Sequence, residues 1–311
     1  MTHIYQAKDF IQTAEGLVFA VVEQGLEAGK VLCFLRYRLE ENVWHKLATQ
    51  QANDLLTEQY PQYLFFSTVK SAYLHAVDVE DIAIHHQPRR CLQAILTKQN
   101  PDRIEQDLIA LCQLFQPQGI PLQDLGVTGS ILITAQNPSS DIDLIVYGRK
   151  LFHQLRNIIK KLIVANKLQQ LDDVAWQASY QRRLCDLSYS DYVWHEQRKY
   201  NKALINHRKF DLNLLEHAEL ESLSYQKHGA IIIRAVVVDA QYAFDYPARF
   251  LIAHGKISEV VCYTATYTGQ AEQGEMIEVS GQLEVSSNGL QRILVGSTRE
   301  AQGEYIKVLV A

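Results

Sequence analysis

The stretch LGVTGSILITAQNPSSDIDLIVYG, residues 125–148, decides the fold. Its apolar start predicts a strand that runs into a turn at Gly129-Ser130, and a second strand is predicted to begin at Asp141. In this second strand Asp141 and Asp143 alternate with aliphatic residues. Because strand side chains change face at every residue, both carboxylates should share one face while the aliphatic side chains enter the core.

These residue types favour the binding of a metal and a phosphate. The two like charges of Asp141 and Asp143 repel each other unless a cation lies between them, and Mg²⁺ takes one or two carboxylates together with phosphate oxygens. Gly129 has no Cβ to keep a ligand from the backbone, and Ser130 offers a hydroxyl and an N–H in a turn whose amides can hold an anion. The two halves of the stretch therefore predict a site for a metal-bound polyphosphate.

The arrangement resembles the nucleotidyltransferase superfamily to which DNA polymerase beta belongs. The pattern of that superfamily is Gly-Ser, a spacer of about ten residues, and then Asp-x-Asp or Asp-x-Glu between apolar residues. Here Gly129-Ser130 is followed by ten residues and then by Asp141-Ile142-Asp143. The resemblance implies a polymerase-beta-like core, Mg²⁺ as the cofactor, and Asp141 and Asp143 as metal ligands and catalytic residues.

The same resemblance implies a third carboxylate, on a later strand beside the first pair. Asp211 is the preferred candidate, because Phe210 and Leu212 on either side of it alternate as in a strand with one buried face. Asp186 and Asp191 remain alternatives, although their surroundings are typical of a helix or a turn. Asp211 is thus expected to complete the metal site and to take part in catalysis.

Length and composition place the chain among ordinary globular proteins. With 311 residues, two or three domains are expected. The content of 47% hydrophobic and 21% charged residues excludes a disordered chain, and no apolar run approaches the roughly 20 residues of a membrane-spanning helix. The start of the sequence shows no secretory signal, and the five cysteines form no C-x-x-C pair. We therefore expect a cytoplasmic protein with no membrane partner.

We expect an α+β fold in three parts: a small N-terminal α+β domain over residues 1–87, a nucleotidyltransferase domain over 88–216, and an OB-like β-barrel over 229–311. The resemblance to the superfamily covers the second part. The whole chain also looks similar to predicted nucleotidyltransferases of the same layout. A polar linker is expected at 216–228.

Local patterns predict the elements of each part. In the first part they predict strands at 17–22, 31–37, 63–66 and 73–77 and a helix at 48–59. In the second part they predict a helix from the N-cap Asn100 through Phe115 and another over 151–163. In the third part they predict five strands, at 231–238, 257–267, 276–285, 290–295 and 305–310, with an irregular insertion near 245–254. A small closed barrel of the OB type accommodates such strands.

Charge is unevenly distributed. The chain has a net charge of -5, yet residues 149–209 carry 13 Lys/Arg against 5 Asp/Glu. We expect the phosphates to contact this region, with Arg198, Lys199 and Lys202 as candidate secondary contacts of the nucleotide. Residues 227–311 carry 7 Lys/Arg against 9 Asp/Glu, which weakens the expectation that the barrel binds single-stranded nucleic acid.

The expected activity is the Mg²⁺-dependent transfer of a nucleoside monophosphate from an NTP to a hydroxyl of RNA or protein, with release of pyrophosphate. Gly129 and Ser130 would hold the terminal phosphates. Two alternatives remain: a catalytically silent protein that binds nucleotide or nucleic acid, and an antitoxin-like partner that modifies or masks another protein. Antitoxin-like relatives often carry a basic residue soon after Gly-Ser, whereas residues 131–137, ILITAQN, contain none. The base, the acceptor and the oligomeric state stay open.

Overall fold

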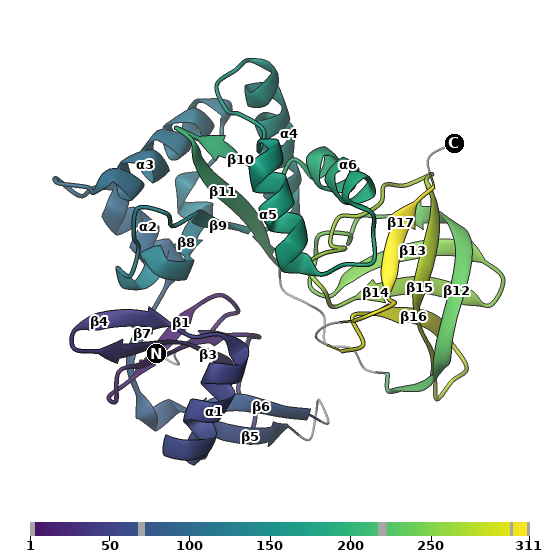
Figure 1. Ribbon diagram of the computed structural model, residues 1–311, viewed down its shortest axis with the longest axis horizontal. Helices are drawn as coiled ribbons and strands as arrows, with labels where there is room; N and C mark the ends of the chain where they lie inside the picture. The colour runs from purple at the N-terminus through teal and green to yellow at the C-terminus, as the bar shows by residue number, and fades with distance from the viewer. Residues whose placement is uncertain (1–3, 68–71, 217–222, 299–300, 310–311) are drawn as a thin grey trace. The chain divides into compact units, whose positions relative to one another are not determined.

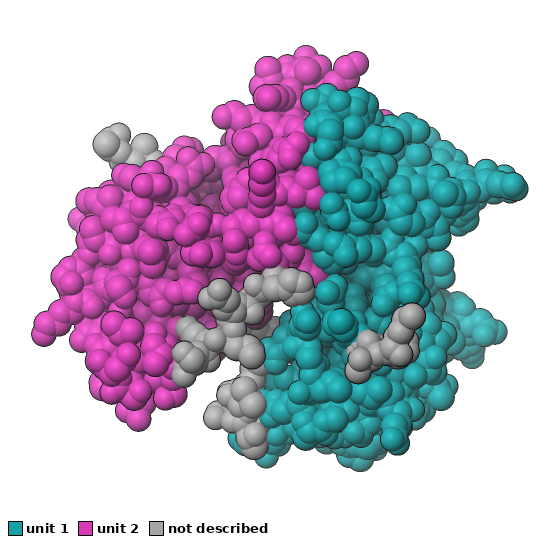
Figure 2. All heavy atoms as spheres, turned by 180° about the vertical axis from the view of Figure 1, so that it is seen from behind, with its two compact units in different colours: residues 1–147, 210–213 teal, residues 148–209, 214–311 magenta. Residues whose placement is uncertain are grey.

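The computed structural model describes residues 4–67, 72–216, 223–298 and 301–309. The fold is α+β, as expected, with helices and three sheets among these residues (Figure 1). The chain forms two compact units, one of residues 1–147 and 210–213 and the other of residues 148–209 and 214–311 (Figure 2). This division runs through the expected nucleotidyltransferase region, and the three-domain scheme stays a prediction.

The N-terminal region is a seven-stranded sheet in the order β5-β6-β3-β2-β1-β7, with β4 paired to β3. Its strands are β1 (Phe10–Thr13), β2 (Leu17–Val21), β3 (Lys30–Glu40), β4 (Val43–Lys46), β5 (Leu64–Ser67), β6 (Ala72–Asp78) and β7 (Ile82–His86). Helix α1 (Thr49–Gln59) packs Leu55 and Leu56 against the sheet residues Phe19 and Leu35. The predicted helix and strands are confirmed, whereas β1, β4 and β7 were missed.

The quoted stretch forms two strands of a four-stranded sheet in the order β10-β11-β9-β8. The strands are β8 (Leu125–Thr128), β9 (Ile142–Tyr147), β10 (Lys202–Ile205) and β11 (Arg208–Leu215). Helix α2 (Pro88–Leu96) lies directly on β8, since a Cβ on Gly126 would be 2.8 Å from the Cβ of Pro88. The predicted strand–turn–strand unit is therefore confirmed.

Four further helices belong to the predicted central region: α3 (Arg103–Phe115), α4 (Arg149–Val164), α5 (Asp173–Arg183) and α6 (Tyr189–Lys199). Short 3₁₀ turns are η1 (Pro61–Tyr63), η2 (Val79–Asp81), η3 (Gln116–Gln118), η4 (Leu122–Asp124) and η5 (Gly129–Ile133). The prediction that Asn100 caps α3 is wrong. Asp102 caps it, because its carboxylate accepts from the N–H of Glu105 while the Glu105 side chain accepts from the N–H of Asp102.

The C-terminal region is a six-stranded sheet in the order β12-β13-β14-β16-β15-β17. Its strands are β12 (Tyr225–Asp239), β13 (Ala248–His254), β14 (Ile257–Cys262), β15 (Met276–Ser286), β16 (Gln291–Val295) and β17 (Tyr305–Val308). Strand β15 also pairs with β12, so the pairing returns to its first strand. The pair β14–β16 is parallel.

Two predictions for this region need correction. The expected irregular insertion near 245–254 contains β13, whose buried Phe250 and Ile252 alternate along the strand. The expected linker at 216–228 is shorter, because β12 begins at Tyr225, and residues 217–222 lie outside the described part of the chain. No helix among the described residues is long and apolar enough to cross a membrane.

Candidate active site

The carboxylate pair lies where the alternation of the sequence predicts it. Asp141 immediately precedes β9 and Asp143 lies within it, and both are half-buried. Ile142 and Leu144 between and after them are fully buried. Burial of one face thus leaves Asp141 and Asp143 together on the other face of the strand.

Gly129 lies directly against one of these carboxylates. A Cβ on Gly129 would be 2.6 Å from Oδ2 of Asp143, closer than real Cβ contacts, and the φ angle of Gly129 is +71°. The register of β8 and β9 brings this about, because Thr128, the residue before Gly129, is the cross-strand partner of Asp143. Gly129 is therefore required both by its backbone conformation and by the close approach of Asp143.

The loop between the turn and the pair is held by its own polar side chains. Oδ1 of Asn137 accepts from the N–H of Ser139 at 3.0 Å, and Oγ of Ser140 accepts from the N–H of Asn137 at 3.0 Å. Asn often closes such local turns with its side chain. At the other end of the loop, the carbonyl of Ser130 accepts from the N–H of Ala135 at 2.8 Å. The loop thus brings the chain back to Asp141.

The strand of Asp211 lies beside the strand of the pair, as predicted. Phe210 and Leu212 are buried, while Asp211 between them is half-buried. On the same strand, Nδ2 of Asn213 donates to the carbonyl of Leu144 at 3.4 Å. Within the described residues, no three His, Cys, Asp or Glu side chains form a group that could hold a metal. Asp211 as the third ligand stays a prediction.

The two alternative aspartates have partners in the C-terminal region. Oδ2 of Asp186 accepts from the N–H of Gly303 at 2.8 Å, and Oδ2 of Asp191 pairs with Nζ of Lys307 at 2.8 Å. Asp191 also lies in the first turn of α6, whose N-cap is Ser188. These contacts give both aspartates a structural role.

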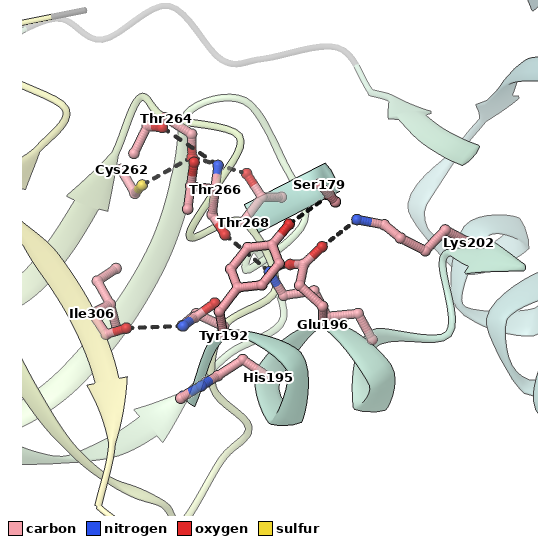
Figure 3. Close-up of polar contacts among 12 residues, drawn as sticks. Ser179, Tyr192, His195, Glu196, Lys202, Cys262, Thr264, Thr266, Thr268 and Ile306 are labelled. Atoms are coloured by element: carbon pink, nitrogen blue, oxygen red, sulfur yellow. Dashed lines mark hydrogen bonds and ion pairs between the residues drawn. The ribbon is translucent and has the colours of Figure 1, made fainter. Parts of the chain in front are cut away.

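The predicted basic contacts Arg198, Lys199 and Lys202 form ion pairs with glutamates. Glu196 is central: its Oε1 is 2.5 Å from Nζ of Lys199, and Lys202 pairs with its Oε2 (Figure 3). Nζ of Lys199 also donates to the carbonyl of Thr266 at 3.0 Å. Burial alone would raise the pKa of Glu196, but the two lysines lower it to about 2. Lys199 and Lys202 therefore balance a buried carboxylate.

Arg198 lies in the last turn of α6 and also forms an ion pair. One of its guanidinium nitrogens is 2.6 Å from Oε2 of Glu275, and the guanidinium stacks over the ring of Trp194 at 4.4 Å. Together with the hydrogen bond from Nζ of Lys199 to the carbonyl of Thr266, this ion pair ties α6 to the C-terminal region. Phosphate binding by Arg198, Lys199 and Lys202 stays a prediction, and the observed contacts give all three a packing role.

Asp141 and Asp143 fit a magnesium ion as a pair of ligands. Their oxygens are the ligand type that Mg²⁺ prefers, and both residues keep solvent contact on one strand face. The missing Cβ of Gly129 leaves room for the carboxylate of Asp143 beside the turn. These two residues would hold the ion, and substrate oxygens and water would fill its other positions.

The structure adds a residue that the sequence pattern did not suggest. Oγ1 of Thr128 donates to the carbonyl of Lys8 at 2.9 Å, so the chain before β1 reaches the end of β8. Lys8 and Thr128 are 120 residues apart, and no local periodicity links them. Only the folded chain could identify Lys8 as a neighbour of the site.

The chain is 33% identical to the uncharacterized protein MJ1086 of Methanocaldococcus jannaschii over 335 residues, which cover 97% of this chain and 98% of the relative. The chain belongs to the family of that protein. No family model matches it, and no solved structure matches it. The match covers nearly all of both chains, and the function has to be argued from the residues of the site.

Proposed function

We propose that the chain is a Mg²⁺-dependent nucleotidyltransferase that moves a nucleoside monophosphate from an NTP to an acceptor hydroxyl of RNA or protein and releases pyrophosphate. The observation that carries the proposal is the contact between Gly129 and the carboxylate of Asp143, with Asp141 on the same strand face. The N–H groups of a Gly-Ser turn can bind phosphate, and the paired carboxylates beside it can bind the metal. We further propose that the protein acts in the cytoplasm.

Each residue has a distinct role in this proposal. Asp141 and Asp143 hold the metal, which lowers the pKa of the attacking hydroxyl and neutralises the triphosphate when it is bound. The Gly129-Ser130 turn holds the terminal phosphates through its N–H groups and the Ser130 hydroxyl. Asp211, on the neighbouring strand, completes the acceptor side and accepts the proton of the hydroxyl.

The finer fold assignment belongs to the same proposal. Adjacent strands β8, β9 and β11 support a polymerase-beta-like core within residues 88–216. The return of the strand pairing from β15 to β12, with the parallel pair β14–β16, supports an OB-type barrel within 229–311. Gly281 fits such a bend, since a Cβ there would be 2.4 Å from the carbonyl oxygen of Leu294.

The test is a transfer assay with the full chain. Each of the four NTPs, labelled on the α-phosphate, is incubated with Mg²⁺ and with total RNA or total protein, and pyrophosphate release and label transfer are measured. We expect transfer from at least one NTP and none with Asp143→Asn. Metal-dependent nucleotide binding without pyrophosphate release from any NTP would indicate the catalytically silent alternative. A stably co-purifying protein that loses activity would indicate the antitoxin-like alternative.

A further inference from the structure

Lys8 is fixed next to the candidate site through its backbone. Its N–H donates to the carbonyl of Val21 at 3.0 Å, and its carbonyl accepts from Oγ1 of Thr128 at 2.9 Å. Thr128 is in turn the cross-strand partner of Asp143. Lys8 also has a φ angle of +75°, which a non-glycine residue adopts at a cost and which these contacts maintain. Lys8 is thus held at the end of the strand pair that carries Asp143.

Arg36 lies on β3 next to Tyr37, whose side chain packs with Leu132 and Ile133 after the Gly129-Ser130 turn. In the pairing of β2 with β3, Val18 pairs with Tyr37 and Phe19 pairs with Leu35, so Arg36 is the extra residue of a β-bulge. Bulges redirect a side chain and are frequent beside active sites. Arg36 is half-buried, and its carbonyl accepts from the N–H of Leu47 at 2.8 Å. Its backbone, like that of Lys8, is held by neighbouring strands.

A shared core joins the N-terminal sheet to the turn of the site. Phe10, Val18 and Tyr37 of the sheet pack with Leu132 and Ile133 of η5, all of them buried. These two η5 residues follow the Gly129-Ser130 turn within a few positions. The sheet that carries Arg36, and that follows directly after Lys8, is therefore anchored at the turn.

The pKa of Lys8 responds to the charges of Asp143 and Arg36, which agrees with the backbone contact of Lys8 to Thr128. The pKa of Lys8 is lowered overall. Burial lowers it most, the negative charge of Asp143 raises it, and the positive charge of Arg36 lowers it further. Burial raises the pKa of Tyr37, with Arg36 lowering it and Asp143 raising it. Lys8 keeps solvent contact although protein atoms crowd its ammonium. Among the described residues, neither Lys8 nor Arg36 forms a side-chain hydrogen bond or ion pair.

We propose that Lys8 and Arg36 bind the triphosphate of the nucleotide, so that the N-terminal sheet supplies the phosphate-binding cations of the site. The inference rests on the proposed function. Asp141 and Asp143 together neutralise the charge of one Mg²⁺, and the triphosphate then needs other cations. Residues 131–137 after the turn supply none. A guanidinium and an ammonium beside the metal ligands provide the paired and single contacts that phosphate oxygens accept.

The experiment measures binding of inorganic tripolyphosphate, and separately of ATP, to the full chain with Mg²⁺ by calorimetry. Lys8→Gln and Arg36→Gln should each weaken tripolyphosphate binding by about tenfold or more, as loss of a hydrogen bond to a charged group does. Lys8→Arg should retain most of the affinity. Lys46→Gln is the control, because Lys46 is an exposed cation on β4 of the same sheet.

The outcomes separate this inference from the proposed function. If the wild type binds no tripolyphosphate, or if both glutamine variants bind it within about twofold of Lys46→Gln, the inference is overturned. If tripolyphosphate binding depends on Lys8 or Arg36 but no NTP yields pyrophosphate, the proposed function fails and the inference holds. Thermal unfolding shows whether each variant is folded. Because Lys8 and Arg36 lie on different segments, misfolding of one variant still leaves the other to test the inference.

Discussion

The carboxylate of Asp143 lies so close to Gly129 that a Cβ on the glycine would be 2.6 Å from Oδ2. The distance joins the turn that is proposed to hold phosphate to a residue that is proposed to hold the metal. The strand register brings the two together, because Thr128, the residue before Gly129, is the cross-strand partner of Asp143. The contact provides a direct test of the site.

Gly129→Ala should abolish transfer, because the new methyl group must displace the Asp143 carboxylate. The positive φ adds about 1–2 kcal/mol of strain. Gly119→Ala is the matched control: its φ is +80° and its Cβ would meet nothing within 4 Å. Both variants should lose similar stability in urea unfolding, and only Gly129→Ala should lose pyrophosphate release. Equal activity in the two variants would show that the Gly129–Asp143 contact has no part in catalysis.

Asp141→Asn and Asp143→Asn should each abolish transfer without unfolding the protein, since each removes a metal ligand from a half-buried strand face. The unfolding temperature measured without metal shows whether each variant is folded. Asp54→Asn, on the exposed face of α1, controls for the loss of one charge. Activity within about tenfold of the wild type, which corresponds to a rise of less than about 1.4 kcal/mol in the activation barrier, would contradict the metal assignment.

Local patterns were sufficient for strands β8, β9 and β11 and for helices α1, α3 and α4, whereas α2 and β10 were not predicted. The alternation of Asp141 to Leu144 predicted the faces of β9 because one face is buried, which fixes a period of two. The start of α3 was also encoded, but in the pair Asp102 and Glu105 rather than in Asn100. Two polar residues, Asn100 and Asp102, were candidates for the N-cap, and the reciprocal hydrogen bonds of the capping box favour Asp102.

Contacts over long sequence distances could not be predicted in this way. Lys8 reaches Thr128 through packing of the N-terminal sheet, and no periodicity reports such a contact. The cluster of positive charge at Arg198, Lys199 and Lys202 indicated a phosphate site, but all three side chains form ion pairs with glutamates. Glu196 lies on the same helix, and Glu275 lies far along the chain. Charge counts over a window therefore overstate how much charge is available to a ligand.

Acid should weaken the fold through His195. Burial lowers the pKa of this histidine to about 4, and its Nε2 accepts from the N–H of Val308 at 3.0 Å. The unfolded chain therefore takes up a proton near the ordinary pKa of 6.5 while the folded chain does not. The stability that comes from keeping His195 neutral is fully present above about pH 6.5 and is lost as the pH falls toward 4, by roughly 3 kcal/mol in total.

Urea unfolding between pH 7 and pH 4 measures this loss. His195→Gln should lower stability at pH 7 but flatten its dependence on pH, because the titrating group is gone. His45→Gln, an exposed histidine on β4, should keep the wild-type slope. A wild-type slope that persists in His195→Gln would assign the acid sensitivity to other groups.

Asp211→Ala should abolish transfer while leaving nucleotide affinity nearly intact, because the metal of the nucleotide keeps Asp141 and Asp143 as ligands. The strand order supports the choice, since β11 of Asp211 lies beside β9. Asn213→Ala is the matched control, being two residues away on the same strand face with one long hydrogen bond to Leu144. Pyrophosphate release and ATP binding are measured for both. An active Asp211→Ala variant would show that Asp211 has no catalytic role. If an Asp186→Ala or Asp191→Ala variant folds but loses turnover, that residue is the third carboxylate.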